Sequence, residues 1–201
     1  MVSRGEATSS TGRPRSEEAH NAILSATLEL LAEVGYSALT VEGVASRAGV
    51  GKATIYRRWA SKGPLVVEAF GQLPSFEDVD TGDLGEDLKQ MLRAYIVAFN
   101  STALSAVLPS LAGERTHDVE LSKVFEPVSL GRRAPLLRAF ERAQIRGEIS
   151  DQTDLEMAAD VVVGPIAVCL FFKGGRLNAK MVDPMVDLAL HGIRGASSGL
   201  D

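Results

Sequence analysis

The segment from Thr40 to Lys62 constrains the fold of this 201-residue chain more than any other part of the sequence. Thr40 can cap a short amphipathic helix that ends at Gly49, and a second short helix is predicted to begin at Lys52. Gly49 suits the turn between them, because such a turn needs a positive φ. Ile55 can then lock the second helix onto the first. Two short helices joined by a glycine-containing turn are typical of a helix-turn-helix.

The distribution of charge supports a nucleic-acid contact at this segment. The whole chain carries a net charge of −5, which argues against a uniformly basic binder. Residues 1–62 nevertheless hold eight Lys and Arg against six Asp and Glu, whereas residues 63–201 hold thirteen against twenty. A local basic stripe on an acidic protein indicates a surface for nucleic acid, although isolated cations are usually a solvated face. Residues 43–67 contain no acid and five cations, namely Arg47, Lys52, Arg57, Arg58 and Lys62.

Apolar residues recur at helical spacing along most of the chain, and no stretch alternates as a strand would. We therefore expect an all-α protein. The pattern predicts a disordered arm over residues 1–15, a helix-turn-helix domain over residues 16–71, and a second helical domain over residues 84–194. Pro127 and Pro135 are expected to break or kink the long helix of the second domain, since proline removes a helical hydrogen bond.

A longer pattern of residues runs through this part of the chain, namely Ile23, Leu30, Gly35-Tyr36, Thr40-Val41, Gly49-Val50, Thr54-Ile55-Tyr56, Trp59, Ser61-Lys62 and Leu65. These positions together resemble the tetracycline-repressor (TetR) family of transcriptional regulators. The resemblance covers about residues 16–70 and implies a three-helix DNA-binding domain, followed by a C-terminal helical domain for ligand binding and dimerisation. The sequence departs from the family pattern at Gly43 and at Gly63-Pro64.

The resemblance implies a role for each matching residue of the helix-turn-helix. The second helix would enter the major groove, where arginine can bind guanine through two hydrogen bonds. Trp59 is expected to pack against the first helix. The implied DNA contacts are Tyr56 and Lys62 to phosphate, Thr40 to the backbone, Lys52, Ala53 and Arg57 to bases, and Thr54 and Arg58 to either.

The same resemblance implies an apolar effector pocket and a homodimer interface in the C-terminal domain. Each pocket candidate has core packing as its alternative interpretation. Helices at about residues 154–172 and 178–192 are apolar on more than one face, so we predict that a second subunit covers them. The pocket candidates are Met91, Tyr95, Phe99, Leu108, Phe125, Phe140 and Met157.

Other kinds of site have little support in the sequence. The segment around Lys52 is not a phosphate-binding loop, because Ser46 replaces its first glycine and Ala53 follows the lysine. The histidines lack neighbours at metal-ligand spacing, and no catalytic motif occurs. We therefore expect no metal, no cofactor and no enzymatic activity. The longest uncharged apolar run, residues 161–172, is shorter than the roughly 20 residues of a membrane span. No signal peptide is evident, so a cytoplasmic location is predicted.

These observations predict a repressor that a small apolar effector releases from a pseudo-palindromic operator. Two alternatives remain open at this stage. One is an all-α ligand-binding protein or enzyme in which the helix-turn-helix is incidental. The other is a sequence-tolerant DNA binder that responds to no effector.

Overall fold

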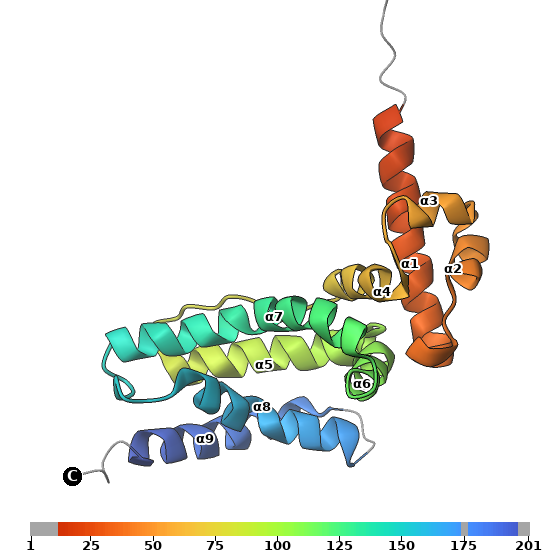
Figure 1. Cartoon of the computed structure of the whole chain (residues 1–201). Helices are drawn as coiled ribbons and strands as arrows, with labels where there is room; N and C mark the ends of the chain where they lie inside the picture. The colour runs from red at the N-terminus through yellow and green to blue at the C-terminus, as the bar shows by residue number, and fades with distance from the viewer. Residues whose placement is uncertain (1–11, 174–176, 197–201) are drawn as a thin grey trace, which may run out of the picture.

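A computed structural model of the chain describes residues 12–173 and 177–196. The described residues form helices and no strands, which confirms the predicted all-α class. Most of the predicted arm lies outside the described residues, but α1 begins at Gly12, so residues 12–15 of that arm are helical. Figure 1 shows the order of α1 (Gly12–Ala38), α2 (Val41–Ala48), α3 (Lys52–Tyr56), α4 (Lys62–Gly71), α5 (Leu84–Ser101), α6 (Leu104–Glu114), α7 (Val119–Ile145), α8 (Leu155–Phe171), η1 (Ala179–Met181) and α9 (Val182–Ala196).

The first four helices form a small N-terminal domain around α1. Helices α2 and α4 both pack on α1, and α3 packs on α2. Near its end α1 turns sharply at Gly35, whose φ of 75° is a conformation that glycine adopts without strain. The core of this domain is apolar and buried, with side chains that include Ile23, Leu31, Val44, Ile55 and Leu65.

The remaining helices form a larger C-terminal domain. Figure 1 shows the long helices α5 and α7 side by side, with α8 and α9 below them. Asp83 caps α5 by accepting a hydrogen bond from the Glu86 N–H at 2.9 Å. Apolar residues on the inner side of each helix close the core. They include Leu88, Leu92 and Ile96 of α5, Leu136 and Phe140 of α7, Val162 of α8 and Val186 of α9.

Helix α7 is continuous through both of its prolines, so the expected break does not occur there, whereas a kink stays a prediction. A proline removes a single backbone hydrogen bond from a helix of 27 residues. The buried side chains of Phe125 and Phe140 hold the two halves of α7 in the core on either side of the prolines. Tertiary packing therefore compensates for the local cost.

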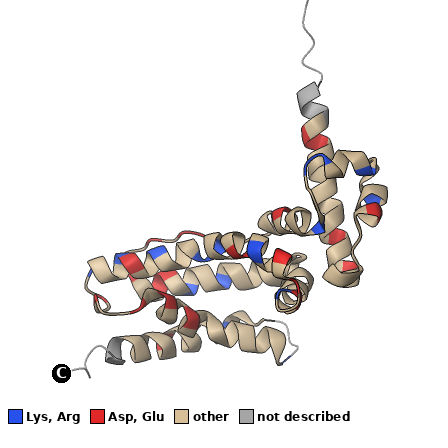
Figure 2. Ribbon diagram, viewed as in Figure 1, with Lys and Arg blue, Asp and Glu red and all other residues tan. Residues whose placement is uncertain are grey.

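Ion pairs fasten the acidic connector between the domains to α7. The Asp78 carboxylate accepts hydrogen bonds from Arg138 at 2.7 Å and from Arg142 at 3.0 Å. Asp80 pairs with Arg142 and with Arg146. The hydrogen bond from Arg138 is the main cause of a lowered pKa at Asp78. Figure 2 shows acidic and basic residues interspersed along α7, so this surface does not present a uniform positive field.

The two domains also meet through direct contacts. Helix α1 packs on α6, and α4 packs on α7. Arg132 of α7 donates to the carbonyl oxygens of Leu73, at 2.8 Å, and of Pro74, and its guanidinium lies 4.4 Å from the centre of the Phe70 ring. The end of α4 is thus bound to α7 by a charged hydrogen-bond donor.

No single helix in the described ranges is both long and apolar enough to cross a membrane. Helices α5 and α6 meet the criterion only as a pair, and they are bent by 93° at the break between them.

Candidate nucleic-acid interface

Helices α2 and α3 form the turn that the sequence predicts. The Thr40 hydroxyl accepts a hydrogen bond from the Gly43 N–H at 3.1 Å and so caps α2. Gly49 ends this helix with a φ of 66°, and the Val50 N–H bonds back to the Ala45 carbonyl at 3.0 Å. This left-handed cap reverses the chain within two residues.

Gly43, which departs from the family pattern, lies where space is limited. A Cβ atom built there would lie 3.2 Å from the Thr40 hydroxyl oxygen and 3.6 Å from Leu30. The contact with the capping hydroxyl is tighter than a Cβ normally tolerates. Glycine therefore leaves room for the cap at a small cost in helix propensity.

Buried and exposed residues alternate along α3 in a way that fixes its outward face. Ile55 is 1% exposed and packs in the core, and Trp59 is buried directly after the helix. The predicted packing role of Trp59 is therefore confirmed. Six of the predicted DNA contacts lie on the outer surface around α3, with Thr54 half-buried and Lys52, Ala53, Tyr56, Arg57 and Arg58 exposed.

The cations of this surface already have partners within the protein. The Lys52 ammonium donates to the Glu42 carboxylate at 2.7 Å, and this hydrogen bond raises the pKa of Lys52 and lowers that of Glu42. Arg57 donates to the Thr54 hydroxyl at 3.3 Å. Both cations remain exposed, so a phosphate or a base can replace or supplement these partners.

Lys62, the first residue of α4, lies apart from the surface around α3 and is half-buried against the end of α1. Its ammonium donates to the Tyr36 carbonyl at 2.8 Å and lies 4.2 Å from the centre of the Tyr36 ring. An ammonium has three donors, so this bond leaves others for a phosphate. The structure places Lys62 at a junction between α1 and α4, a role that sequence reasoning missed.

Sequence reasoning also missed a cluster around Arg58, because its members are far apart in the chain. Arg58 donates to the Ser16 carbonyl at 2.9 Å and to the Ser16 hydroxyl at 2.6 Å, and it lies 3.0 Å from His20 Nδ1. His20, which the sequence presents as an isolated histidine, stacks on Trp59 and approaches Glu68. No sequence signal short of the folded contact brings these residues together.

The structure distributes the seven pocket candidates over different environments. Met91, Phe99, Phe125 and Phe140 are buried in the core, and Tyr95 and Leu108 are half-buried. Tyr95 stacks on Phe76 with 4.5 Å between ring centres. Met157 is 63% exposed and lies on α8. Their shared role as an effector site remains a prediction.

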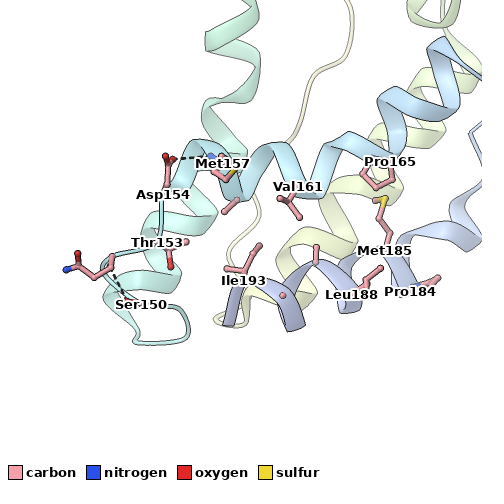
Figure 3. A pocket seen from close by; sticks show the side chains of 14 residues that line it. Ser150, Thr153, Asp154, Met157, Val161, Pro165, Pro184, Met185, Leu188 and Ile193 are labelled. Carbon is pink, nitrogen blue, oxygen red and sulfur yellow. Dashed lines mark hydrogen bonds between the residues drawn. The ribbon is translucent and has the colours of Figure 1, made fainter. Parts of the chain in front are cut away.

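A groove of about 900 Å³ lies between α8 and α9, and Met157 is the one pocket candidate that lines it. Figure 3 shows Met157 and Val161 of α8 and Leu188 and Ile193 of α9 along this groove. Leu188 is 78% exposed in the single chain. The groove is therefore an apolar surface on the two helices that the sequence assigns to dimerisation.

Comparison with known proteins agrees with this architecture. Residues 23–69 match the family model described as "Bacterial regulatory proteins, tetR family", and residues 78–189 match "Tetracyclin repressor-like, C-terminal domain". The chain is 30% identical over 197 residues to the uncharacterized HTH-type transcriptional regulator YdeS of Bacillus subtilis, covering 94% of this chain and 97% of YdeS. It is 32% identical over 198 residues to the DNA-binding transcriptional repressor TetR of Mycobacteroides abscessus, covering 93% and 94% of the two chains.

A solved structure supports the same assignment. The crystal structure of the TetR family transcription regulator SCO0332 superposes with a TM-score of 0.68 and 30% sequence identity, covering 88% of this chain and 98% of that one. Both family models lie on the domains that the helices define, and the relatives align over nearly their full length. The chain belongs to the TetR family of helix-turn-helix transcriptional regulators.

Proposed function

We propose that this regulator is a homodimeric repressor that inserts α3 into the major groove of a pseudo-palindromic operator. The observation that carries the proposal is the outer surface of α3, where Lys52, Arg57 and Arg58 are exposed while Ile55 anchors the helix in the core. Cationic donors on a rigid helix supply both phosphate attraction and base contacts. A cytoplasmic location is part of this proposal.

The proposed contacts divide into two classes. Lys52, Ala53 and Arg57 face base edges, and Thr54 and Arg58 reach bases or phosphates. Tyr56, Lys62 and Thr40 contact the phosphate backbone, which fixes position but carries no sequence information. Substitutions in the two classes should therefore have different effects on specificity.

Dimerisation through α8 and α9 follows from the groove between them. Its apolar lining, with Met157, Val161 and Leu188 exposed to water in a single chain, favours coverage by the same surface of a second copy. Two-fold symmetry then places the two copies of α3 on half-sites about 34–36 Å apart or a multiple of that distance.

A small apolar effector is proposed to bind in the C-terminal domain among the residues around Tyr95, Leu108 and Phe99. Such a ligand must bind the DNA-incompetent conformer more tightly to release the operator. A coupling free energy of about 1–3 kcal/mol would weaken operator binding about 5- to 150-fold. The packing of α4 against α7 and of α1 against α6 supports a transmission of this effect to the DNA-binding domain.

Selection from a library of random duplexes of about 40 base pairs tests the proposal directly, since two half-sites of about one helical turn each must fit. The expected result is an enriched inverted repeat. Arg57→Ala should relax the base preference at one position of each half-site. Tyr56→Phe and Lys62→Ala should weaken binding to all duplexes alike, and Lys62→Ala should lower the salt slope by about one.

The sequence-tolerant DNA binder is the alternative that this experiment separates. It predicts that the protein binds every duplex and that the selection enriches no particular sequence. Absence of any DNA binding at low salt would instead favour a ligand-binding protein in which the helix-turn-helix is incidental. Unchanged base preference in Arg57→Ala would remove Arg57 from the base-reading set.

A further inference from the structure

Two residues of α1, Ser16 and His20, hold the Arg58 guanidinium, although they lie 42 and 38 positions from it in the sequence. Two of its hydrogen bonds go to Ser16 on α1, and a third contact joins its Nη1 to His20 Nδ1 at 3.0 Å. A guanidinium has five N–H donors, so these bonds leave donors for a DNA phosphate. Arg58 is therefore exposed and yet fixed in direction.

The contacts of the His20 ring determine its tautomer. An arginine can only donate, so His20 Nδ1 must accept the Arg58 hydrogen bond. On the other side of the ring, Nε2 lies 3.2 Å from Oε1 of Glu68, and a carboxylate can only accept. Both neighbours thus select the neutral ring with its proton on Nε2.

Glu68 also fixes the plane of this ring. Its second oxygen accepts a hydrogen bond from Trp59 Nε1 at 2.6 Å. The His20 ring stacks on the Trp59 ring with 5.5 Å between centres and 17° between planes. Glu68 of α4 therefore orients both rings, and Trp59 is itself buried.

We propose that His20, oriented by Glu68, is a positioning residue that holds the Arg58 guanidinium ready for its DNA contact. This inference rests on the proposed function, which makes Arg58 a DNA contact. An arginine that is already held in one geometry loses less side-chain freedom on binding than one that is free in solvent.

The first experiment is a double-mutant cycle on the duplex that the wild-type protein enriches, followed by fluorescence anisotropy. His20→Phe keeps a ring against Trp59 but removes the hydrogen bond with Arg58 and the contact of Nε2 with Glu68. It should weaken binding about 3- to 10-fold at neutral pH, the usual effect of one lost hydrogen bond, and should have no further effect in an Arg58→Ala background. Additive losses, or an unchanged Kd for His20→Phe, would overturn the inference.

A second variant keeps the histidine in place. In Glu68→Gln, the amide oxygen must face Trp59, which can only donate, so the amide NH₂ faces His20 Nε2. The ring must then carry its proton on Nδ1, which breaks the contact with Arg58. Removal of an acidic side chain would by itself strengthen DNA binding. A higher Kd for this variant therefore identifies the lost positioning of Arg58.

Imidazole ¹⁵N shifts give a readout that a merely structural role would not move. They should report the Nε2–H tautomer in the wild-type protein and the Nδ1–H tautomer in Glu68→Gln. Glu29→Gln on α1, the helix that carries His20, is the control. It should leave unchanged both the His20 tautomer and the coupling between His20 and Arg58. If Arg58→Ala alone leaves the Kd unchanged, the proposed DNA contact fails. If Arg58→Ala weakens binding but the tautomer does not change in Glu68→Gln, only the positioning role fails.

Discussion

The Tyr36 hydroxyl donates a hydrogen bond to the Asp118 carboxylate at 3.1 Å, and this bond joins the two domains. Tyr36 lies at the end of α1, and Asp118 caps the start of α7 by accepting from the Leu121 N–H at 2.9 Å. The Tyr36 N–H also donates to the Ser110 hydroxyl of α6 at 3.0 Å. One residue of the DNA-binding domain thus contacts two helices of the C-terminal domain.

Tyr36→Phe should loosen this junction without creating a cavity, since it removes only the hydroxyl. The expected result is a decrease of about 2–4 °C in the midpoint of thermal unfolding, the usual effect of one hydrogen bond in a chain of this size. Circular dichroism at 222 nm measures it. Tyr56→Phe is the control, because the Tyr56 side chain is 50% exposed, and equal midpoints for the two variants would contradict the prediction.

The same bond predicts a loss of stability in alkali. Burial is the main cause of a raised pKa at Tyr36, and the charge of Asp118 adds to it. An unfolded tyrosine ionises near pH 10, so above that pH the unfolded state releases a proton that the folded state keeps. The stability due to Tyr36 is present below about pH 10 and decreases above it.

Urea unfolding between about pH 9 and pH 11.5 measures this dependence. The wild-type protein should lose more stability across the interval than Tyr36→Phe does. Parallel curves for the two proteins would show that Tyr36 ionises equally in both states.

The turn at Gly49 should tolerate alanine poorly, even though a Cβ atom there meets nothing within 4 Å. Its φ of 66° is left-handed, and this conformation costs a residue with a Cβ about 1–2 kcal/mol. Gly49→Ala should therefore lower the free energy of unfolding by that amount and weaken DNA binding through the displaced α3.

Gly131 provides the matched control for this prediction. It is exposed inside α7, and a Cβ there also meets nothing within 4 Å. Because its φ is not left-handed, Gly131→Ala should raise the free energy of unfolding by about 0.5–1 kcal/mol. Changes of the same sign in both variants would show that φ is not the deciding factor.

Leu188→Glu should disrupt the dimer without unfolding the subunit. Leu188 is 78% exposed in the single chain, so the substitution removes little from the core. A charge in the proposed interface must be desolvated on association, which opposes dimerisation. Sedimentation velocity should show a monomer for this variant and a dimer for Val97→Glu, whose parent valine is 62% exposed on α5. If both variants are dimers, the dimer interface does not include Leu188.

The helix-turn-helix was predictable because its determinants are local. Thr40 and Gly49 act within one or two turns of their own positions, as a capping hydroxyl and a left-handed cap. Exposed Arg57 and buried Ile55 follow from helical periodicity alone. The continuity of α7 was not predictable, because core packing of Phe125 and Phe140 offsets a local cost that the sequence shows plainly.

The candidate effector residues mark the other limit of sequence reasoning. Met91 and Met157 are both apolar residues in helices, yet one is buried in the core and the other lies on the α8–α9 surface. Their difference depends on which helix faces each of them. Apolar character alone does not distinguish a core position from an interface position.

Local patterns were enough to predict the helical class, the location of the turn and the basic face around α3, because capping, periodicity and charge act over a few residues. The contacts of His20 with Arg58, of Tyr36 with Asp118 and of Lys62 with α1 arise only when the helices pack together. These contacts join residues separated by between 26 and 82 positions. Long-range pairs depend on how whole helices pack, and no local rule of the chain specifies that packing.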